Sequence, residues 1–265
     1  MTRNSGAIFW AIILIAIGAI FLLQNLGVLR GNVWGSLWPI FLILLGVVLL
    51  FGNFTRRAAM ATAQSIPLAD AREARIRVDH GAGQLRVDAQ STPGILVDSS
   101  ADDNFHFTTR RDGDRLEVHL SQTHDGMFWM NPGNWGRAFR WSLNLSREVP
   151  LWLEFKSGAS ESIINLRDLE VREVSLETGA SKTELTLPAR GHTTARVSAG
   201  AAEVRVYVPE GVAARIRAST GMASVNIDQS RFPSHGGVYE SPNFESAENR
   251  AEIHIEGGVG NFVVR

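Results

Sequence analysis

The fold is decided by residues 157–224, in which one glycine-centred motif occurs four times. The copies are Ser-Gly-Ala-Ser at 157–160, Thr-Gly-Ala-Ser at 178–181, Ala-Gly-Ala-Ala at 199–202 and Thr-Gly-Met-Ala at 220–223. Their glycines stand 21 residues apart without drift, at Gly158, Gly179, Gly200 and Gly221. A fixed period of this length is typical of proteins built from stacked, equivalent segments.

The residues on both sides of each glycine alternate between apolar and polar. Val174 and Leu176, for example, are apolar, whereas Ser175 between them is polar. This period of two is typical of a β-strand with one buried face, so each repeat is predicted to be strand, glycine turn, strand. The glycine permits a backbone conformation that a side chain would forbid, and its small neighbours let successive coils approach closely.

Two diverged copies of the repeat flank these four, with Gly81 and Gly258 at the turn position. Insertions at about 90–149 and 228–250 separate them from the regular copies, and the outer copies are expected to cap the stack. The sequence therefore predicts an all-β soluble domain over residues 73–265, namely a β-solenoid with coils of about 21 residues.

Residues 1–53 carry very little charge and are predicted to form a transmembrane helical hairpin. Two apolar runs, at about 6–29 and 33–52, can each cross the ~30 Å hydrocarbon layer as a helix. A cleaved signal peptide is the alternative for the first run, but its apolar part is long and a second run follows at once. A soluble helical hairpin is disfavoured because both runs are apolar on all faces.

Flanking residues indicate how the hairpin would sit in a membrane. A linker is predicted at 54–72, and Gln24-Asn25 is either a polar contact within the bilayer or the head-group end of the first helix. Positive charges at Arg3 and after the second helix outweigh Arg30 in the turn, which places both termini and the β domain in the cytoplasm. The predicted interface anchors are Trp10, Trp34, Trp38, Arg56 and Arg57.

Residues 124–141 are unusually rich in aromatic side chains and carry two arginines. One interpretation is a loop that contacts the membrane surface or a partner protein. The other is a lid over the open end or a face of the solenoid core, because an exposed apolar patch of this size is a liability. The candidate contact residues are Phe128, Trp129, Trp135, Arg137, Phe139 and Arg140.

Signatures of catalysis or of cofactor binding are not found in this sequence. There is no Gly-x-Ser-x-Gly, His-Glu-x-x-His, Walker or dinucleotide motif, and the seven histidines are scattered. The chain has no cysteine, so thiolate metal sites and disulfides are excluded. The net charge of −1 gives no global signature of nucleic-acid binding. We therefore expect no enzyme activity, no cofactor, no metal and no nucleic-acid partner.

The chain resembles two known families. The hairpin is similar to the LiaI/LiaF-like transmembrane region at Gln24-Asn25-Leu26-Gly27, Trp38-Pro39-Ile40 and Leu44-Leu45-Gly46. The remainder resembles the toastrack domains of LiaF-type envelope-stress proteins and of adhesin-type proteins with related architecture. This resemblance rests on the recurring Thr-Gly-Ala motif, residues 141–150, Leu-Thr-Leu-Pro at 185–188 and Val-Tyr-Val-Pro at 206–209.

The resemblance implies a bacterial cell-membrane protein of the envelope-stress type. In LiaF-like systems such a protein restrains a membrane histidine kinase until the envelope is damaged. The leading hypothesis is a non-enzymatic sensor or regulator, with the lipid bilayer, a histidine kinase or another envelope-stress component, and further copies of itself as partners. The alternative is a membrane-tethered structural or adhesin-like solenoid that self-assembles or faces outward.

Overall fold

The computed structural model describes residues 62–90, 92–101, 105–122 and 140–265. These residues belong to one compact unit, which comprises residues 60–123 and 138–265. The unit is built mostly of β-strands, as the repeat pattern predicts. Within the described ranges, no helix is long and apolar enough to cross a membrane.

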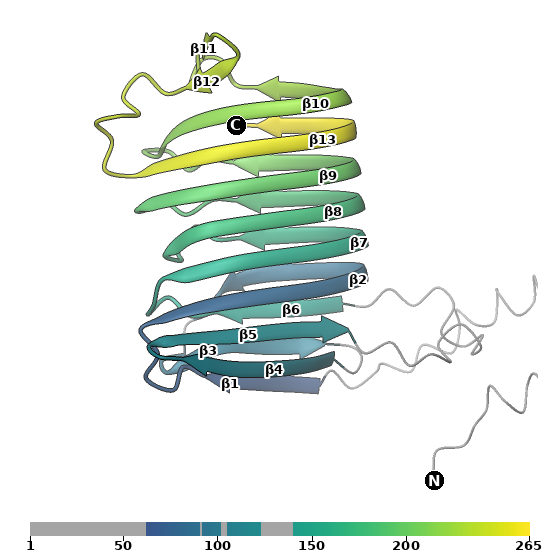
Figure 1. Cartoon of the computed structure of the whole chain (residues 1–265), viewed down its shortest axis with the longest axis vertical. Helices are drawn as coiled ribbons and strands as arrows, with labels where there is room; N and C mark the ends of the chain where they lie inside the picture. The colour runs from purple at the N-terminus through teal and green to yellow at the C-terminus, as the bar shows by residue number, and fades with distance from the viewer. Residues whose placement is uncertain (1–61, 91, 102–104, 123–139) are drawn as a thin grey trace, which may run out of the picture. The chain divides into compact units, whose positions relative to one another are not determined.

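Thirteen strands of the described part of the chain join in one sheet (Figure 1). The strands are β1 (Thr62–Pro67), β2 (Glu73–Ala89), β3 (Ile95–Ala101), β4 (Phe105–Asp112), β5 (Arg115–Gln122), β6 (Arg140–Leu145), β7 (Leu151–Asn165), β8 (Val171–Thr186), β9 (His192–Tyr207), β10 (Ala213–Ile227), β11 (Ser234–His235), β12 (Val238–Glu240) and β13 (Arg250–Val264).

The six long strands β2, β7, β8, β9, β13 and β10 lie side by side in parallel. Each bends near its middle, so that its first and second halves lie in two facing layers (Figure 1). Equivalent residues of successive repeats are neighbours: Val174 pairs with Leu153 on one side and with Ala195 on the other. The regular spacing of the repeats along the sequence therefore becomes a column of equivalent residues across the strands.

The last copy of the repeat lies inside the stack and does not cap it as expected. Strand β13 is inserted between β9 and β10, where Ile253 pairs with Ala195 and Ile216 (Figure 1). Side-chain size accounts for this order. Ile255 and Phe262 of β13 are each 1% exposed, whereas the residues of β10 that pair with them are the smaller Ala218 and Val225, which are only partly buried. Large apolar side chains need neighbours on both sides to be fully buried.

Part of the predicted linker 54–72 is a strand. Residues 62–67 form β1, which pairs antiparallel with β3. Ile66 and Leu68 are buried against the core, so this short segment covers apolar surface that would otherwise face water. The predicted boundary at residue 73 thus falls after the first strand of the domain.

The first insertion, 90–149, extends the stack at its N-terminal end. Strand β5 pairs in parallel with the first half of β2, and β6 pairs in parallel with the second half. Strands β4 and β3 then add in antiparallel orientation outside β5 and β6, respectively. Both layers therefore continue past β2, as expected for strands that extend the sheet.

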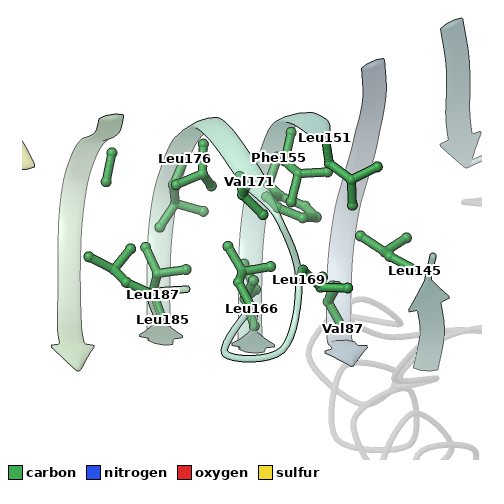
Figure 2. Close-up of a cluster of buried hydrophobic side chains, with 14 of the residues drawn as sticks. Val87, Leu145, Leu151, Phe155, Leu166, Leu169, Val171, Leu176, Leu185 and Leu187 are labelled. Atoms are coloured by element: carbon green, nitrogen blue, oxygen red, sulfur yellow. The ribbon is translucent and has the colours of Figure 1, made fainter. Parts of the chain in front are cut away.

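The core fills the space between the two layers. Leu151, Phe155 and Leu176 come from the first halves of their strands, and Val87 and Leu185 come from the second halves (Figure 2). All five are at most 1% exposed. Burial of an aliphatic or aromatic side chain of this kind contributes roughly 1.5–3 kcal/mol, so the column of repeated apolar positions is the main source of stability.

Candidate interaction surfaces

The six glycines predicted to mark the repeat turns come together in one column. Each of these glycines lies inside one continuous strand without positive φ, so it marks a close approach of neighbouring strands and not the predicted turn between two strands. A Cβ atom built on Gly158 would stand 2.6 Å from the carbonyl oxygen of Gly81, and one on Gly179 would stand 2.8 Å from that of Gly158. Any side chain in these places would force the strands apart. From the first long strand to the last, the column reads Gly81, Gly158, Gly179, Gly200, Gly258 and Gly221.

An exposed row of apolar residues runs beside this column, one residue after each glycine. The row contains four alanines, followed by larger side chains on the last two long strands. Val259 on β13 is 49% exposed and Met222 on β10 is 83% exposed. These two side chains belong to paired residues of β13 and β10. The largest exposed apolar group of the corner therefore lies on the last strand of the stack.

A network of paired charges covers the outer face of β5, β2, β7 and β8. The Asp79 carboxylate lies 2.6 Å from His119 Nε2 and accepts a hydrogen bond of 3.2 Å from Arg77. Burial opposes ionisation of Asp79, but the hydrogen bonds with His119 and Arg77 hold its pKa below the ordinary value. Lys156 bridges the next two strands, at 3.3 Å from Glu154 and 2.8 Å from Glu177. Such a face suits contacts with polar, mixed-charge protein surfaces.

One buried imidazole stands out at the N-terminal end of the glycine column. His80 is 1% exposed, its ring lies 5.2 Å from that of Trp141, and neither ring nitrogen has a hydrogen-bond partner among the described residues. Burial lowers the pKa of His80, and a weaker interaction with the backbone of Gly83, which does not meet hydrogen-bond geometry, opposes this shift. In the sequence this residue is only one of seven scattered histidines, so nothing marked it as buried.

The second insertion, 228–250, is held against the stack by the pairing of β12 with β10, by hydrogen bonds between Ser241 and Ala214, and by one arginine. Arg215 on β10 forms hydrogen-bonded ion pairs with Glu240 and Glu245, and its guanidinium carbon lies 4.2 Å from the ring centre of Phe244. Two hydrogen bonds raise the pKa of Arg215, the larger contribution coming from Glu240 and the smaller from Glu245. This clamp adds to the strand pairing and to the burial of Phe232 and Phe244, and sequence reasoning missed it.

The outer edge of β10 is open over most of its length. Strand β12 pairs only with residues 215–217 of β10, and the described residues include no strand beside 218–227. Three inward-facing residues of this segment, Ala218, Ala223 and Val225, are only partly buried against the core. Their counterparts on β9 are 1%, 6% and 0% exposed: Val197, Ala202 and Val204.

Several predicted site residues lie outside the described ranges, and so do the two predicted hairpin helices. Of the predicted aromatic and basic contact segment, Arg140 is described, as the exposed first residue of β6. Among the residues with described positions, no three His, Asp or Glu side chains gather so as to hold a metal ion. The predicted residues outside the description are Trp10, Trp34, Trp38, Arg56, Arg57, Phe128, Trp129, Trp135, Arg137 and Phe139.

Comparison with protein-family models identifies both parts of the chain. Residues 8–50 match the LiaI-LiaF-like transmembrane region, and residues 55–207 match the N-terminal domain of toast_rack, DUF2154. Both resemblances seen in the sequence are thereby confirmed, and the transmembrane region places the chain in a membrane. No curated protein matches the sequence.

A solved structure shares the fold of the β domain. The crystal structure of a proposed cell adhesion protein from Clostridium sporogenes ATCC 15579 aligns with a TM-score of 0.68 and 19% identity, over 77% of this chain and 97% of that one. A proposed adhesin from Bacteroides fragilis NCTC 9343 has 7% identity over the same shares, and its TM-score of 0.20 is too low to indicate a common fold. The first likeness supports the architecture described above.

Proposed function

The chain belongs to the toast_rack family, and from this we propose that it is a membrane-anchored regulator of the bacterial cell-envelope stress response. In this proposal it acts through protein–protein contacts of its β domain and has no catalytic activity. The observation that carries the proposal is the pairing of a LiaI-LiaF-like transmembrane region, residues 8–50, with a toast_rack domain in one chain.

The β domain in this proposal is a solenoid with 21-residue coils that presents one long, rigid surface. The pairing of Val174 with Leu153 and with Ala195 supports this reading, because each pair joins residues 21 positions apart. Stacked coils of this kind offer extended faces to partners. The charged face around Asp79 and Lys156 is the proposed contact for a partner protein, because its paired charges set orientation and specificity.

The membrane part is proposed to be a two-pass hairpin with helices at about 6–29 and 33–52, followed by a cytoplasmic β domain. The partner is then a cytoplasmic segment of a membrane histidine kinase or another component of the stress response. The positive charges of Arg3, Arg56 and Arg57 support this orientation, because positively charged residues favour the cytoplasmic side.

The regulatory role is tested by deleting the protein and measuring the transcription of envelope-stress genes. We expect stress output to rise without any cell-wall damage, and the full chain to restore repression. A matched variant, Lys156→Glu, reverses one charge on the proposed contact face and should restore less repression. Arg86→Glu, on an exposed residue in the second half of β2 and therefore in the other layer, is the control. Unchanged stress output in the deletion strain would exclude the regulatory role.

Orientation is tested with a C-terminal reporter that is active only in the cytoplasm. The main-chain groups of Arg265 bond to Val206 and Val208, so the reporter needs a flexible linker. Cytoplasmic activity supports the regulator. A signal from an external reporter supports the second candidate, an outward-facing adhesin-like protein, which is favoured by the likeness to the proposed cell adhesion protein.

A further inference from the structure

We propose that the open edge of β10, over residues 221–227, binds the same edge of a second copy of this chain. The two edge segments would pair antiparallel about a two-fold axis at Ser224. The second-half layers of the two stacks would then join into one continuous sheet, whereas the first-half layer of each stack continues into its own β12 and β11. This inference concerns self-association alone and does not depend on the regulatory function proposed above.

The first argument is that the core is unfinished at this edge. Val225 of β10 is only partly buried, whereas the equivalent Val204 of β9 is 0% exposed. Ala223 is likewise partly buried, and its equivalent Ala202 is 6% exposed. A further strand beside the second half of β10 would complete the burial that every inner repeat already has at the position of Val225. The equivalent buried residues are Leu85, Ser162, Thr183, Val204 and Phe262.

The second argument is that the backbone groups of this edge are available for pairing. Parallel strands turn the N–H and C=O groups of alternate residues to opposite sides. The Asp228 amide donates a 3.0 Å hydrogen bond to Val264 on the β13 side. Ala223, Val225 and Ile227 therefore turn their backbone groups away from β13, toward the open side. An edge of this kind is a template for strand addition.

The third argument identifies the partner as a second copy. Residues 221–227 contain no charged side chain, so two such segments can pair without opposing like charges. Edge strand β4, at the other end of the stack, carries the exposed residues Arg110 and Arg111, and charges of this kind disfavour edge pairing. In Figure 1, β11 and β12 lie to one side of the second half of β10, which leaves that half uncovered by them. Because the two-fold pairing uses the same segment of both copies, it gives a closed dimer and not a filament.

The register follows from the length of the open segment. Ser224 is the central residue between the corner at Gly221 and the end of the strand at Ile227. Pairing about Ser224 sets Ala223 opposite Val225 on the core side. It also sets Met222, which is 83% exposed, opposite Asn226 on the outer side. Ala223 and Val225 then exchange hydrogen bonds, and the two Ser224 residues face each other without them.

Cysteine cross-linking in the intact chain tests this register directly, because the natural chain has no cysteine. Facing residues of a pair without mutual hydrogen bonds have Cα atoms about 4.5 Å apart, which lies within the range of a disulfide. With mild oxidation in native membranes, Ser224→Cys should form a covalent dimer about tenfold faster than the control Ser219→Cys on the first half of β10. Co-expressed Met222→Cys and Asn226→Cys should cross-link to each other.

A charge substitution supplies an independent readout. Ser224→Lys places two ammonium groups opposite each other in the dimer and leaves the monomer unaltered, because Ser224 is exposed. We expect the detergent-solubilised chain to change from dimer to monomer by light scattering, with unchanged thermal unfolding. The proposal is overturned if Ser224→Cys reacts no faster than Ser219→Cys or if the wild-type chain is already monomeric. The proposal is also overturned if the Ser224→Cys chain cross-links to a different polypeptide and not to a second copy of itself.

Discussion

A Cβ atom on Gly158 would stand 2.6 Å from the carbonyl oxygen of Gly81 on the neighbouring strand. Because that atom belongs to the backbone, Gly158→Ala must displace β2 from β7, and overpacking of this kind typically costs about 1–3 kcal/mol. We expect thermal unfolding of the full chain in detergent to begin at a clearly lower temperature. Gly221→Ala is the matched control. Gly221 lies on the last long strand, β10, and its Cβ would stand 3.3 Å from the Gly258 oxygen. Equal losses for both variants would contradict the role of close strand approach.

Acidification should weaken the fold through His80. Burial holds the folded-state pKa of His80 below the ordinary value of about 6.5. As the pH falls below that ordinary value, the unfolded chain binds a proton that the folded chain does not, so stability decreases. His80→Leu should therefore reduce the difference in unfolding temperature between about pH 8 and about pH 5.

The control for this pH dependence is His192→Leu, because His192 is exposed at the start of β9. Its substitution should leave the pH dependence as in the natural chain. A His80→Leu chain with the full natural pH dependence would show that other titrating groups are responsible.

Loss of the Arg215 clamp should release the second insertion. Lysine keeps the positive charge but cannot bind two carboxylates in a planar fork or stack on Phe244 in the same way. Limited proteolysis of Arg215→Lys should cut residues 228–249 faster than in the natural chain. In the control Arg217→Lys, two residues along the same strand, residues 228–249 should be cut at the natural rate. Equally fast proteolysis of Arg217→Lys and Arg215→Lys would argue against the clamp.

The turn before β2 stores a small amount of backbone strain that glycine should relieve. Ala69 has φ of 50°, in a region that residues with a side chain rarely adopt, and its carbonyl accepts a hydrogen bond from Arg111. Ala69→Gly should be neutral or stabilise the domain by up to about 1 kcal/mol. Chemical denaturation measures this change. A loss of stability would mean that the strain at this position is negligible compared with the entropy of glycine.

The repeated strands could be predicted because the same physical requirement is stated several times in the sequence. The predicted turn at each glycine is instead a position inside one continuous strand, where φ is not positive. Each copy pairs alternating apolar residues with a glycine, so Val174 and its equivalents specify both strand and register. The resemblance to the toastrack domains rests partly on the same repeated motif. Strand β1 escaped prediction because Ile66 is the single large buried residue within a short, mainly polar segment.

The order of strands at the C-terminal end could not be predicted from the repeat itself. Every copy satisfies the same pattern, so any of them can pair with any other in register. The choice of β13 as the neighbour of β9 depends on the larger inward residues of β13 and on the path of residues 228–249. The open edge at β10 follows from that choice, and neither Ala223 nor Val225 is distinctive in sequence.

The inserted position of β13 has a consequence for synthesis of the chain on the ribosome. Strands β9 and β10 emerge before β13, and they carry equivalent alternating patterns. Direct pairing of β10 with β9 would occupy the place that β13 fills in the native sheet. In the nascent chain, direct pairing of β10 with β9 therefore competes with the native strand order. The native order can be completed only after Val264 has left the exit tunnel. Native assembly at this end is therefore delayed until β13 has been synthesised.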